Sequence, residues 1–310
     1  MEKILRYTYL NNLKILAIKI SIILPTFNMA SLLDEAIKSV ISQSYNNWEL
    51  IIIDNYSIDN TNEILKKYTD SRIKILKINN NGIIAKSRNA GLENACGDWV
   101  AFLDSDDIWY FQRLEILISA INNNKIDIIS TNELLVNKIT GYKKKLVYGK
   151  KSIDNLYLSL LIYGNILSPS ATIVKKSFIN KNNIKFSEND NFITAEDYDF
   201  WLLLAKHNAT LISLDTVQGE YRVHNNNNSI KNNLHRDNVK NVIFNHIKKL
   251  NINERRKIKL INKVYSRLML TDAKINLNSK KYINGILLIF RSFKKSPFFF
   301  IKKGILTIFK

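Results

Sequence analysis

The sequence predicts an α/β protein with a mainly parallel central sheet, helices on both faces, and a basic helical C-terminal region. From Ser21 onward, short apolar runs alternate with segments of helical spacing, and this alternation is typical of βαβ units. Acidic residues follow two of the predicted strands, at the edge where parallel sheets bind ligands. Positive charge is concentrated after residue 230.

The first elements are predicted from buried runs and amphipathic spacing. The run "SIILP" predicts a buried strand that Pro25 ends, and residues 31–43 predict a helix with Ser31 as its N-cap. Asp59 is expected to cap a later helix. The elements that follow are a strand at 48–54, a helix at 60–69 and a strand at 72–78.

The following segments continue the alternation. A helix is predicted from about Ile83 to Asn94, ended by Cys96 and Gly97, and "WVAFLD" predicts the next strand. A helix and the strand "KIDIIS" come before residue 131, and residues 132–195 show no clear pattern. The apolar residues of "TAEDYDFWLLLAKHN" predict a buried helix that begins near Glu196 and Asp197.

The composition limits the class of protein. The chain has 310 residues, of which 46% are hydrophobic, enough to form a sizeable core. Its single cysteine, Cys96, excludes an internal disulfide and a multi-cysteine zinc site, and it fits a reducing compartment. We expect Cys96 to be a buried free thiol.

The net charge of +19 is unevenly distributed. Residues 1–230 carry 26 Lys and Arg against 24 Asp and Glu, whereas residues 231–310 carry 20 against three. No stretch of 18 uninterrupted apolar residues predicts a transmembrane helix. Residues 1–20 contain scattered basic residues, which argues against a signal peptide, and are expected to form an N-terminal extension.

Three carboxylates follow the apolar run Val100–Leu103 in the segment "AFLDSDDIW". Asp104, Asp106 and Asp107 would repel one another at the end of a buried strand. A divalent cation is the simplest group to compensate this charge, because carboxylate oxygens are hard ligands. Asp54 marks a second acidic strand end.

Five segments in order resemble the inverting glycosyltransferases of family 2, which have the GT-A fold, a Rossmann-like arrangement. They are "SIILPTFNMASLLDEAIKSVISQSYNNWELIIIDNYSIDNT", "NGIIAKSRNAGL", "GDWVAFLDSDDIW", "TAEDYDFWLLLAKH" and "YRVH". The resemblance covers about residues 20–225. It predicts a catalytic domain over 21–230 and leaves 231–310 as a basic, amphipathic helical region.

The resemblance implies how the donor would be held. Asp54 matches the carboxylate that accepts from a uracil or thymine base, whose N3 carries a donor; Pro25 belongs to the same nucleotide-sugar site. Asp104 matches the acid near the ribose, and Asp106 matches the ligand of Mn²⁺ or Mg²⁺. Arg88 would orient the donor or pair with these acids.

Further matches concern the diphosphate, the acceptor and the backbone. Asp197 matches the general base that deprotonates the acceptor hydroxyl, with Glu196 in support; capping of its own helix is the alternative role. Arg222 would contact the diphosphate, and His224 would be a further metal ligand. Two residues look important for backbone geometry, namely Gly82 and Gly91.

The tail interleaves apolar and basic residues, as in "KYINGILLIFRSFKKSPFFFIKKGILTIFK". Such a sequence favours binding to an anionic membrane surface. A solvated helical hairpin packed on the catalytic domain and a nucleic-acid-binding tail are the alternatives. The clustered aromatics fit lipid or protein better than base stacking, so no nucleic-acid partner is expected.

We interpret the sequence as that of a metal-dependent enzyme that transfers a sugar from a UDP- or dTDP-sugar to a carbohydrate acceptor. The configuration of the transferred sugar would be inverted. The acceptor would be a lipid-linked glycan such as O-antigen, capsule or lipooligosaccharide. The enzyme would be cytoplasmic and peripheral, at the inner face of the cytoplasmic membrane. Alternatives are a sugar-phosphate nucleotidyltransferase and a non-catalytic membrane-associated module.

Overall fold

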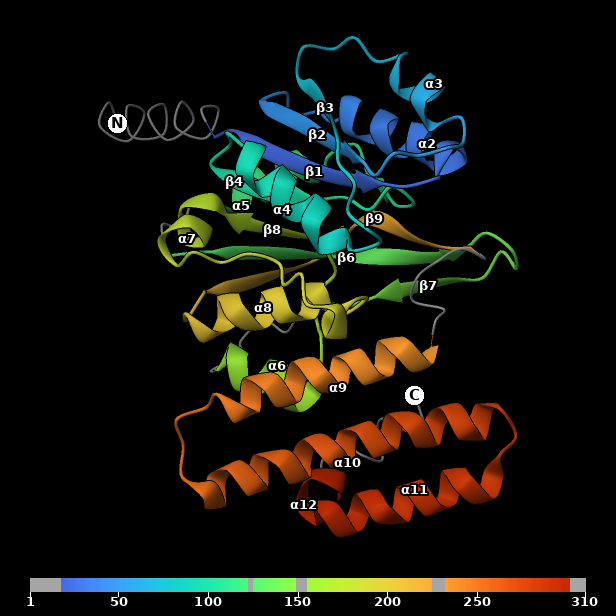
Figure 1. Cartoon of the computed structure of the whole chain (residues 1–310), viewed down its shortest axis with the longest axis vertical. Helices are drawn as coiled ribbons and strands as arrows, with labels where there is room; N and C mark the ends of the chain where they lie inside the picture. The colour runs from blue at the N-terminus through green and yellow to red at the C-terminus, as the bar shows by residue number, and fades with distance from the viewer. Residues whose placement is uncertain (1–17, 122–124, 149–154, 225–231, 302–310) are drawn as a thin grey trace, which may run out of the picture. The chain divides into compact units, whose positions relative to one another are not determined.

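The structure is a computed structural model that describes residues 18–121, 125–148, 155–224 and 232–301. Within these ranges, nine strands form one sheet in the order β3-β2-β1-β4-β8-β6-β9-β5, with β7 paired to β6 (Figure 1). The strands are β1 (Ile20–Thr26), β2 (Trp48–Asp54), β3 (Ile73–Lys77), β4 (Trp99–Phe102), β5 (Ile108–Trp109), β6 (Ile128–Asn137), β7 (Lys143–Leu146), β8 (Thr172–Lys175) and β9 (Leu211–Val223).

Helices connect these strands and continue beyond them. Those that come before β9 in the chain are α2 (Ala30–Ile41), α3 (Thr61–Leu65), α4 (Ile84–Asn94), α5 (Arg113–Ala120), α6 (Leu156–Tyr163), α7 (Lys176–Lys181), the 3₁₀ helix η1 (Asp190–Phe192) and α8 (Glu196–Lys206). The later ones are α9 (Asn232–Lys248), α10 (Glu254–Asn278), α11 (Tyr282–Lys295) and α12 (Pro297–Phe299).

The sheet is mixed but mostly parallel on its N-terminal side. Strands β3, β2, β1 and β4 run parallel to one another, and β6 runs parallel to β9. Strand β8 joins the two parts, antiparallel to both β4 and β6. The predicted mainly parallel sheet with helices on both faces is confirmed, and the carboxyl ends of β1, β2 and β4 meet at one edge.

Pro25 lies inside β1 rather than at its end, so the predicted end of this strand is wrong. A proline nitrogen cannot donate a ladder hydrogen bond, which usually keeps proline out of central strands. Here β4 pairs with β1 only as far as Ile23, and Leu103 then donates to the Ile23 carbonyl at 3.0 Å. Beyond that point only β2 continues the pairing, so the missing donor of Pro25 faces the side that β4 has left.

Ser31 does not cap α2, and this prediction is wrong. The helix begins at Ala30, whose N–H donates to Asp59 Oδ2 at 3.0 Å. The other oxygen of Asp59 accepts from the backbone N–H of Thr61 at 3.1 Å, at the start of α3. One carboxylate therefore serves the first turns of two helices, of which the sequence predicted only the second.

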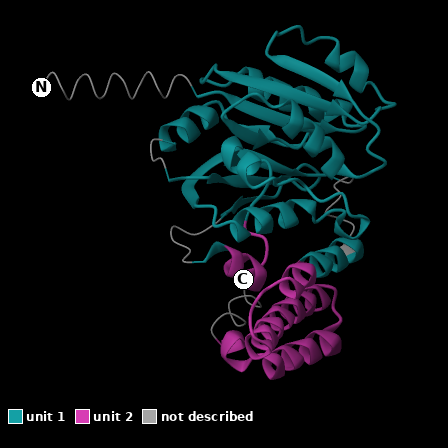
Figure 2. Ribbon diagram, turned by 60° about the vertical axis from the view of Figure 1, so that its left-hand side comes forward, with its two compact units in different colours: residues 1–156, 167–242 teal, residues 157–166, 243–310 magenta. Residues whose placement is uncertain are grey.

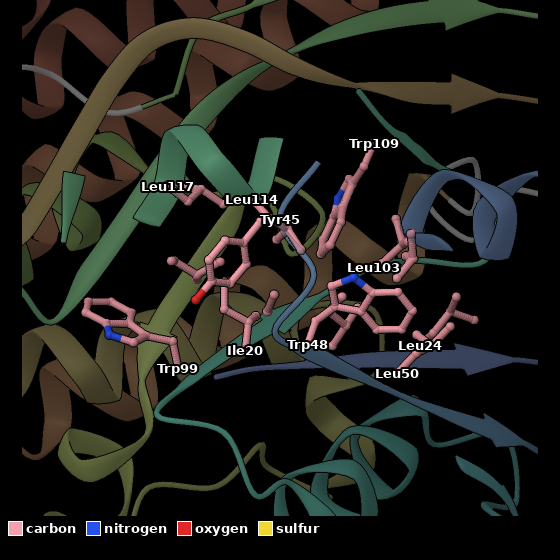
Figure 3. Packing of buried hydrophobic residues seen from close by; sticks show 14 of the residues in the cluster. Ile20, Leu24, Tyr45, Trp48, Leu50, Trp99, Leu103, Trp109, Leu114 and Leu117 are labelled. Carbon is pink, nitrogen blue, oxygen red and sulfur yellow. The ribbon is translucent and has the colours of Figure 1, made fainter. Parts of the chain in front are cut away.

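The main hydrophobic core covers one face of the sheet. On β1, Ile20, Ile22 and Leu24 point into this core, as the two-residue period of a strand requires. Helices α2 and α5 contribute the other side of it. Figure 3 shows four aromatic side chains of this cluster packed among aliphatic ones: Tyr45, Trp48, Trp99 and Trp109.

Helix α4 packs against the opposite face very closely. A Cβ atom at Gly91 would lie 2.5 Å from Ile23 Cγ2, so only glycine permits this approach. Gly82, just before the helix, has φ +77°, a left-handed conformation that glycine adopts without steric cost. Both glycines therefore have the backbone roles that the sequence predicted, and the close packing fixes the position from which Arg88 projects.

Cys96 is exposed, and the predicted burial of its thiol is wrong. It lies in the connection between α4 and β4, where the neighbouring residues Ala95 and Gly97 are buried instead. Its backbone N–H donates to Glu49 Oε1 at 2.7 Å. The connection is thus anchored through the backbone, and the side chain faces solvent.

The described residues divide into two compact units, coloured in Figure 2. The first consists of the described parts of 1–156 and 167–242, and the second of 157–166 and the described part of 243–310. The predicted extension over 1–20 falls mostly outside the described residues, as does the boundary predicted at residue 230. The described chain after residue 231 is largely helical, and none of its helices, nor any other described helix, is long and apolar enough to cross a membrane.

Candidate active site

Asp54 ends β2 and is fully buried. Its Oδ1 accepts the N–H of Ser57 at 3.0 Å, whereas Oδ2 has no hydrogen-bond partner among the described residues. Because an unpaired buried carboxylate oxygen is costly, this atom is suited to accept from a ligand. Pro25 pairs with Ile53 in the sheet register, so it lies beside the residue that precedes Asp54.

The acids after β4, namely Asp104, Asp106 and Asp107, lie close together. Burial, and then the charge of Asp104, raise the pKa of Asp106 above its ordinary value. Burial, and then the charge of Asp106, raise the pKa of Asp107 well above its own. The mutual repulsion that the sequence predicts is therefore present in the folded chain.

Asp107 and Ser170 hold the loop in place. Ser170 Oγ donates to Asp107 Oδ2 at 2.5 Å and accepts the N–H of Asp104 at 3.1 Å. The other oxygen, Asp107 Oδ1, accepts the N–H of Arg222 at 3.0 Å. Sequence reasoning missed Ser170, because nothing in "SPSATIV" indicates a contact with a loop more than sixty residues earlier.

The buried side chain of Arg222 holds the same loop in place. Its side chain is 0% exposed, and its NH1 pairs with Glu35 of α2 at 2.7 Å. Its Nε donates to the carbonyl oxygen of Asp106, and its NH2 to that of Leu32 at 3.4 Å. The guanidinium thereby ties the Asp106 backbone to α2. Its contact with a diphosphate stays a prediction, and Glu35 is a partner that the sequence did not indicate.

Arg88 joins two acidic segments that are distant in the sequence. Its guanidinium, 4% exposed, pairs with Asp104 Oδ1 at 2.9 Å and with Glu196 Oε1 at 2.6 Å. The first acid follows β4, and the second begins α8. A buried arginine between two carboxylates fixes their separation and orientation, because removing it would leave both charges uncompensated.

Asp197 is the second residue of α8 and is half-buried. Burial, followed by the charge of Glu196, raises its pKa to about 7, against the opposing effect of Arg88. A carboxylate that titrates near neutral pH is suited to take a proton from a hydroxyl group. Chemically, the arrangement therefore offers a general base beside an ion-paired scaffold.

The residues present could bind a divalent cation if a bound diphosphate supplied further oxygen ligands. Within the described ranges, no group of three or more His, Cys, Asp or Glu side chains could hold a metal alone. Asp106 Oδ2 and His224 Nε2 lie 3.0 Å apart and offer two ligands. Mg²⁺ in particular is often held by one or two carboxylates together with phosphate oxygens and water. Asp106 and His224 would hold such an ion when a diphosphate is bound.

The fold is shared with solved glycosyltransferase structures. The structure of S. aureus TarS in complex with UDP-GlcNAc has a TM-score of 0.64 at 21% identity, covering 89% of this chain and 81% of that one. The mannosyltransferase PcManGT from Pyrobaculum calidifontis, in complex with GDP-Man and Mn²⁺, gives 0.60 at 15%, covering 87% and 73%. This likeness shows a GT-A fold, the class that the sequence predicted.

The family follows from the sequence itself. The protein-family model described as Glycosyl transferase family 2 matches residues 21–177 of the sequence. The Escherichia coli protein named UDP-Glc:alpha-D-GlcNAc-diphosphoundecaprenol beta-1,3-glucosyltransferase WfgD is 33% identical over 207 residues, which cover 66% of this chain and 77% of the relative. The chain belongs to glycosyl transferase family 2 and is a glycosyltransferase, so the nucleotidyltransferase and non-catalytic alternatives are set aside.

Proposed function

We propose that the chain transfers a sugar from a UDP- or dTDP-sugar to a carbohydrate acceptor, with inversion and with a divalent metal. The observation that carries this proposal is the double ion pair of Arg88, which joins Asp104 to Glu196. Asp197, whose pKa is raised to about 7, directly follows Glu196. These contacts support the proposal, because they connect the proposed donor-side acid to the helix start that carries the proposed base.

The unpaired oxygen of Asp54 supports a uracil or thymine base in the donor. Uracil and thymine carry an N–H at N3, which a carboxylate can accept, whereas cytosine carries none there. Asp54 Oδ2 is buried and has no hydrogen-bond partner among the described residues. The complexes of S. aureus TarS with UDP and with UDP-GlcNAc agree with this choice.

Asp106 and His224 are the proposed metal-holding residues, and Mn²⁺ or Mg²⁺ is the proposed ion. When bound, the ion would stabilise negative charge on the departing diphosphate. The charge of Asp104 raises the pKa of Asp106, and a nearby cation would reverse that effect. Arg222 is proposed to contact the diphosphate, and its bonds to Asp107 and to the Asp106 backbone hold the loop that carries these acids.

The proposed chemical step is a direct displacement at the anomeric carbon. Asp197 takes the proton of the acceptor hydroxyl as its oxygen forms the new glycosidic bond. The bond from the anomeric carbon to the diphosphate breaks, and the nucleoside diphosphate leaves with that electron pair. Attack on the face opposite to the leaving group inverts the configuration, so an α-linked donor gives a β-linked product. Glu196, fixed by Arg88, supports Asp197 through its position and charge.

The proposed acceptor is a lipid-linked precursor of a bacterial surface glycan such as O-antigen, capsule or lipooligosaccharide. The name of the E. coli relative describes transfer to a diphosphoundecaprenol-linked GlcNAc. Residues 231–310, with 20 basic and three acidic residues, are proposed as a region that attaches the enzyme to the inner face of the cytoplasmic membrane.

A transfer assay with defined donors tests the proposal. UDP-glucose, UDP-galactose, UDP-GlcNAc and dTDP-sugars would be offered with Mn²⁺ and a lipid-diphosphate-linked GlcNAc acceptor. We expect transfer from at least one α-linked donor and a β-anomeric proton coupling in the product. An α-linked product from an α-linked donor would contradict inversion, and release of nucleoside monophosphate instead of diphosphate would contradict glycosyl transfer.

A further inference from the structure

Several large apolar side chains in the second unit face solvent on α11 and α12. Ile283 is 77% exposed, Ile286 61% and Phe290 57%, and their spacing places them on one side of α11. Together with Leu287, these residues form what we name the α11 row. Phe298 of α12 is 91% exposed. Scattered exposed apolar residues are ordinary, but a contiguous row marks an interaction surface.

The side of α11 that faces α10 carries small residues at its buried positions, whereas the exposed side carries large apolar ones. Gly285 and Ser292 are the buried residues of α11, while Leu288 and Ile289 are half-buried. A Cβ atom at Gly285 would lie 2.7 Å from the side chain of Leu277. A helix stabilised in water by packing normally turns its largest apolar residues toward its partner. In α11 small residues lie inward and the α11 row lies outward.

Basic residues border the α11 row. Lys294 Nζ lies 4.9 Å from the centre of the Phe290 ring. Acidic residues within 243–301 number only two, Glu254 and Asp272, and both belong to α10. An exposed apolar face with basic borders is complementary to an anionic bilayer surface. The exposed basic residues along α11 and just before it are Lys280, Lys281, Arg291, Lys294 and Lys295.

We propose that the α11 row and Phe298 enter the headgroup boundary of an anionic bilayer, while the bordering lysines and arginine bind lipid phosphates. This proposal rests on the membrane attachment proposed above for residues 231–310 and narrows it to one helix face. A protein partner or a second copy of the chain would use the row without requiring anionic lipid, so lipid dependence separates these occupants.

Co-sedimentation of the full chain with vesicles tests the proposal. Vesicles would contain phosphatidylcholine alone or phosphatidylcholine with phosphatidylglycerol. We expect the wild type to bind the anionic vesicles, and the double variant Ile286→Asp/Phe290→Asp to bind at least about tenfold more weakly. Ile258→Asp, at an α10 residue that is 55% exposed, is the matched control and should bind as the wild type does.

Wild-type chain that stays in solution with both vesicles would overturn the proposal, as would wild-type binding by the double variant. A wild-type dimer that the double variant dissociates would assign the row to a second copy instead. Binding of UDP by the wild type without vesicles is measured in parallel. Absent vesicle binding with intact UDP binding would refute only the membrane surface and leave the proposed reaction standing.

A different observation concerns the turn before α8, in the first unit. Thr194 has φ +70°, a conformation that a β-branched residue rarely adopts. Such residues persist only where their surroundings fix them, and they are often found near functional sites. Thr194 lies three residues before Asp197, so the direction of this turn sets where α8 begins.

Side chains of α9 hold this turn through its carbonyl oxygens. His235 Nδ1 lies 2.8 Å from the Thr194 oxygen, and Asn238 Nδ2 donates to the Ile193 oxygen at 2.7 Å. Because a carbonyl oxygen only accepts, Nδ1 is the protonated nitrogen of His235. The spacing of three residues places both side chains on one face of α9.

We infer that His235 and Asn238 are positioning residues that fix the Thr194 turn and thereby direct Asp197 toward the acceptor. The inference rests on the proposed role of Asp197 as the base. It assigns to α9 a role in catalysis that is separate from membrane attachment, because His235 and Asn238 contact the backbone of the turn.

Steady-state kinetics of three variants test this role, with the folded fraction checked by circular dichroism. His235→Ala and Asn238→Ala should lower kcat about tenfold to a hundredfold and leave the Kd for UDP unchanged. His235→Asn should restore most of kcat, because its Nδ2 can replace the Nδ1 donor. The pH midpoint of kcat should also move in His235→Ala.

A purely structural role would lower the melting temperature and leave kcat per folded molecule and the pH midpoint unchanged, and that result would overturn the inference. Full activity in Asp197→Asn would instead remove the proposed base. The two failures are therefore distinguishable.

Discussion

Two acidic segments at the site balance their charges differently. We name Asp104, Asp106 and Asp107 the β4 acids, and Glu196 and Asp197 the α8 pair. Each of the β4 acids has its own partner. Asp104 pairs with Arg88, Asp106 with His224, and Asp107 accepts a hydrogen bond from Ser170. In the α8 pair, Glu196 forms the second ion pair of Arg88, and the pKa of Asp197 is raised to about 7.

The difference indicates a division of work. Fixed acids that stay close together are suited to a cation, because a cation compensates their repulsion. An acid whose pKa lies near neutral is suited to gain and lose a proton. Arg88 links the two segments, so a change there should affect both, whereas a change at Asp106 or Asp107 should leave the α8 pair intact.

Asp197→Asn should have the largest effect on turnover. We expect kcat to fall about 10²- to 10⁴-fold, because an amide cannot take the hydroxyl proton. UDP affinity should remain, since the β4 acids and Asp54 are unchanged. Asp190→Asn, at an exposed acid of η1, is the control. A kcat within a factor of a few of the wild type would contradict the division.

Arg88→Met should have the largest effect on stability. Breaking a buried pair with two acids should cost about 3 kcal/mol in the free energy of unfolding, measured by urea denaturation. Lys185→Met removes an exposed pair with Glu93, at side-chain exposures of 58% and 61%, and should cost at most about 1 kcal/mol. Equal costs for the two variants would show that Arg88 is not the link between the segments.

Ser170→Ala should have a smaller effect, confined to the β4 acids. The variant leaves Asp107 Oδ2 without its hydroxyl donor in a buried position, which should cost about 2 kcal/mol. Ser44→Ala removes a similar hydroxyl bond to Glu115 in an exposed position and should cost less than about 0.5 kcal/mol. If the pH midpoint of kcat moved in Ser170→Ala, the independence of the α8 pair would be refuted.

The pH profile should show the smallest and most specific effect. Because Asp197 must be ionised to act as a base, kcat should fall as the pH drops below about 7 and level off above it. Glu196→Gln removes a charge that raises this pKa, so the midpoint should move to lower pH. A midpoint that stays in place would mean that the two acids do not interact.

The same pKa shift affects stability in the opposite direction. The pKa of Asp197 is raised from 3.8 to about 7 on folding, so the folded chain binds more protons between these values. Its contribution is fully present below about pH 4 and is lost as the pH rises through 7. Urea denaturation across this range should show a smaller decline in Asp197→Asn than in the wild type; an equal decline would contradict the shift.

The sequence predicted the sheet edge well, because buried parallel strands have a strong local signal. The run "WELIIID" marks β2 from Trp48 to Asp54 as the structure has it, and the acids that follow β2 and β4 meet because parallel strands end together. Predictions from local sequence rules were wrong where a residue or strand distant in the sequence determined the local structure. Asp59 caps α2 in place of Ser31, and Pro25 fits where β4 has ended.

The supporting partners could not be predicted, since they depend on tertiary packing. Ser170 meets Asp107 across 63 positions, and Arg222 meets Glu35 across 187. Neither pair carries a local pattern, because a serine, an arginine and a surface glutamate are ordinary residues in their own segments. Only the folded sheet, which places β9 and the segment before β8 beside the β4 acids, brings these residues together.

Calorimetric titration of UDP tests the central division most directly, with and without Mn²⁺, on the wild type, Asp106→Ala and Asp197→Asn. We predict metal-dependent binding by the wild type, loss of that binding in Asp106→Ala, and retention in Asp197→Asn. Binding that ignores both Mn²⁺ and Asp106, or that disappears equally in both variants, would contradict the assignment of the β4 acids to the donor and of the α8 pair to proton transfer.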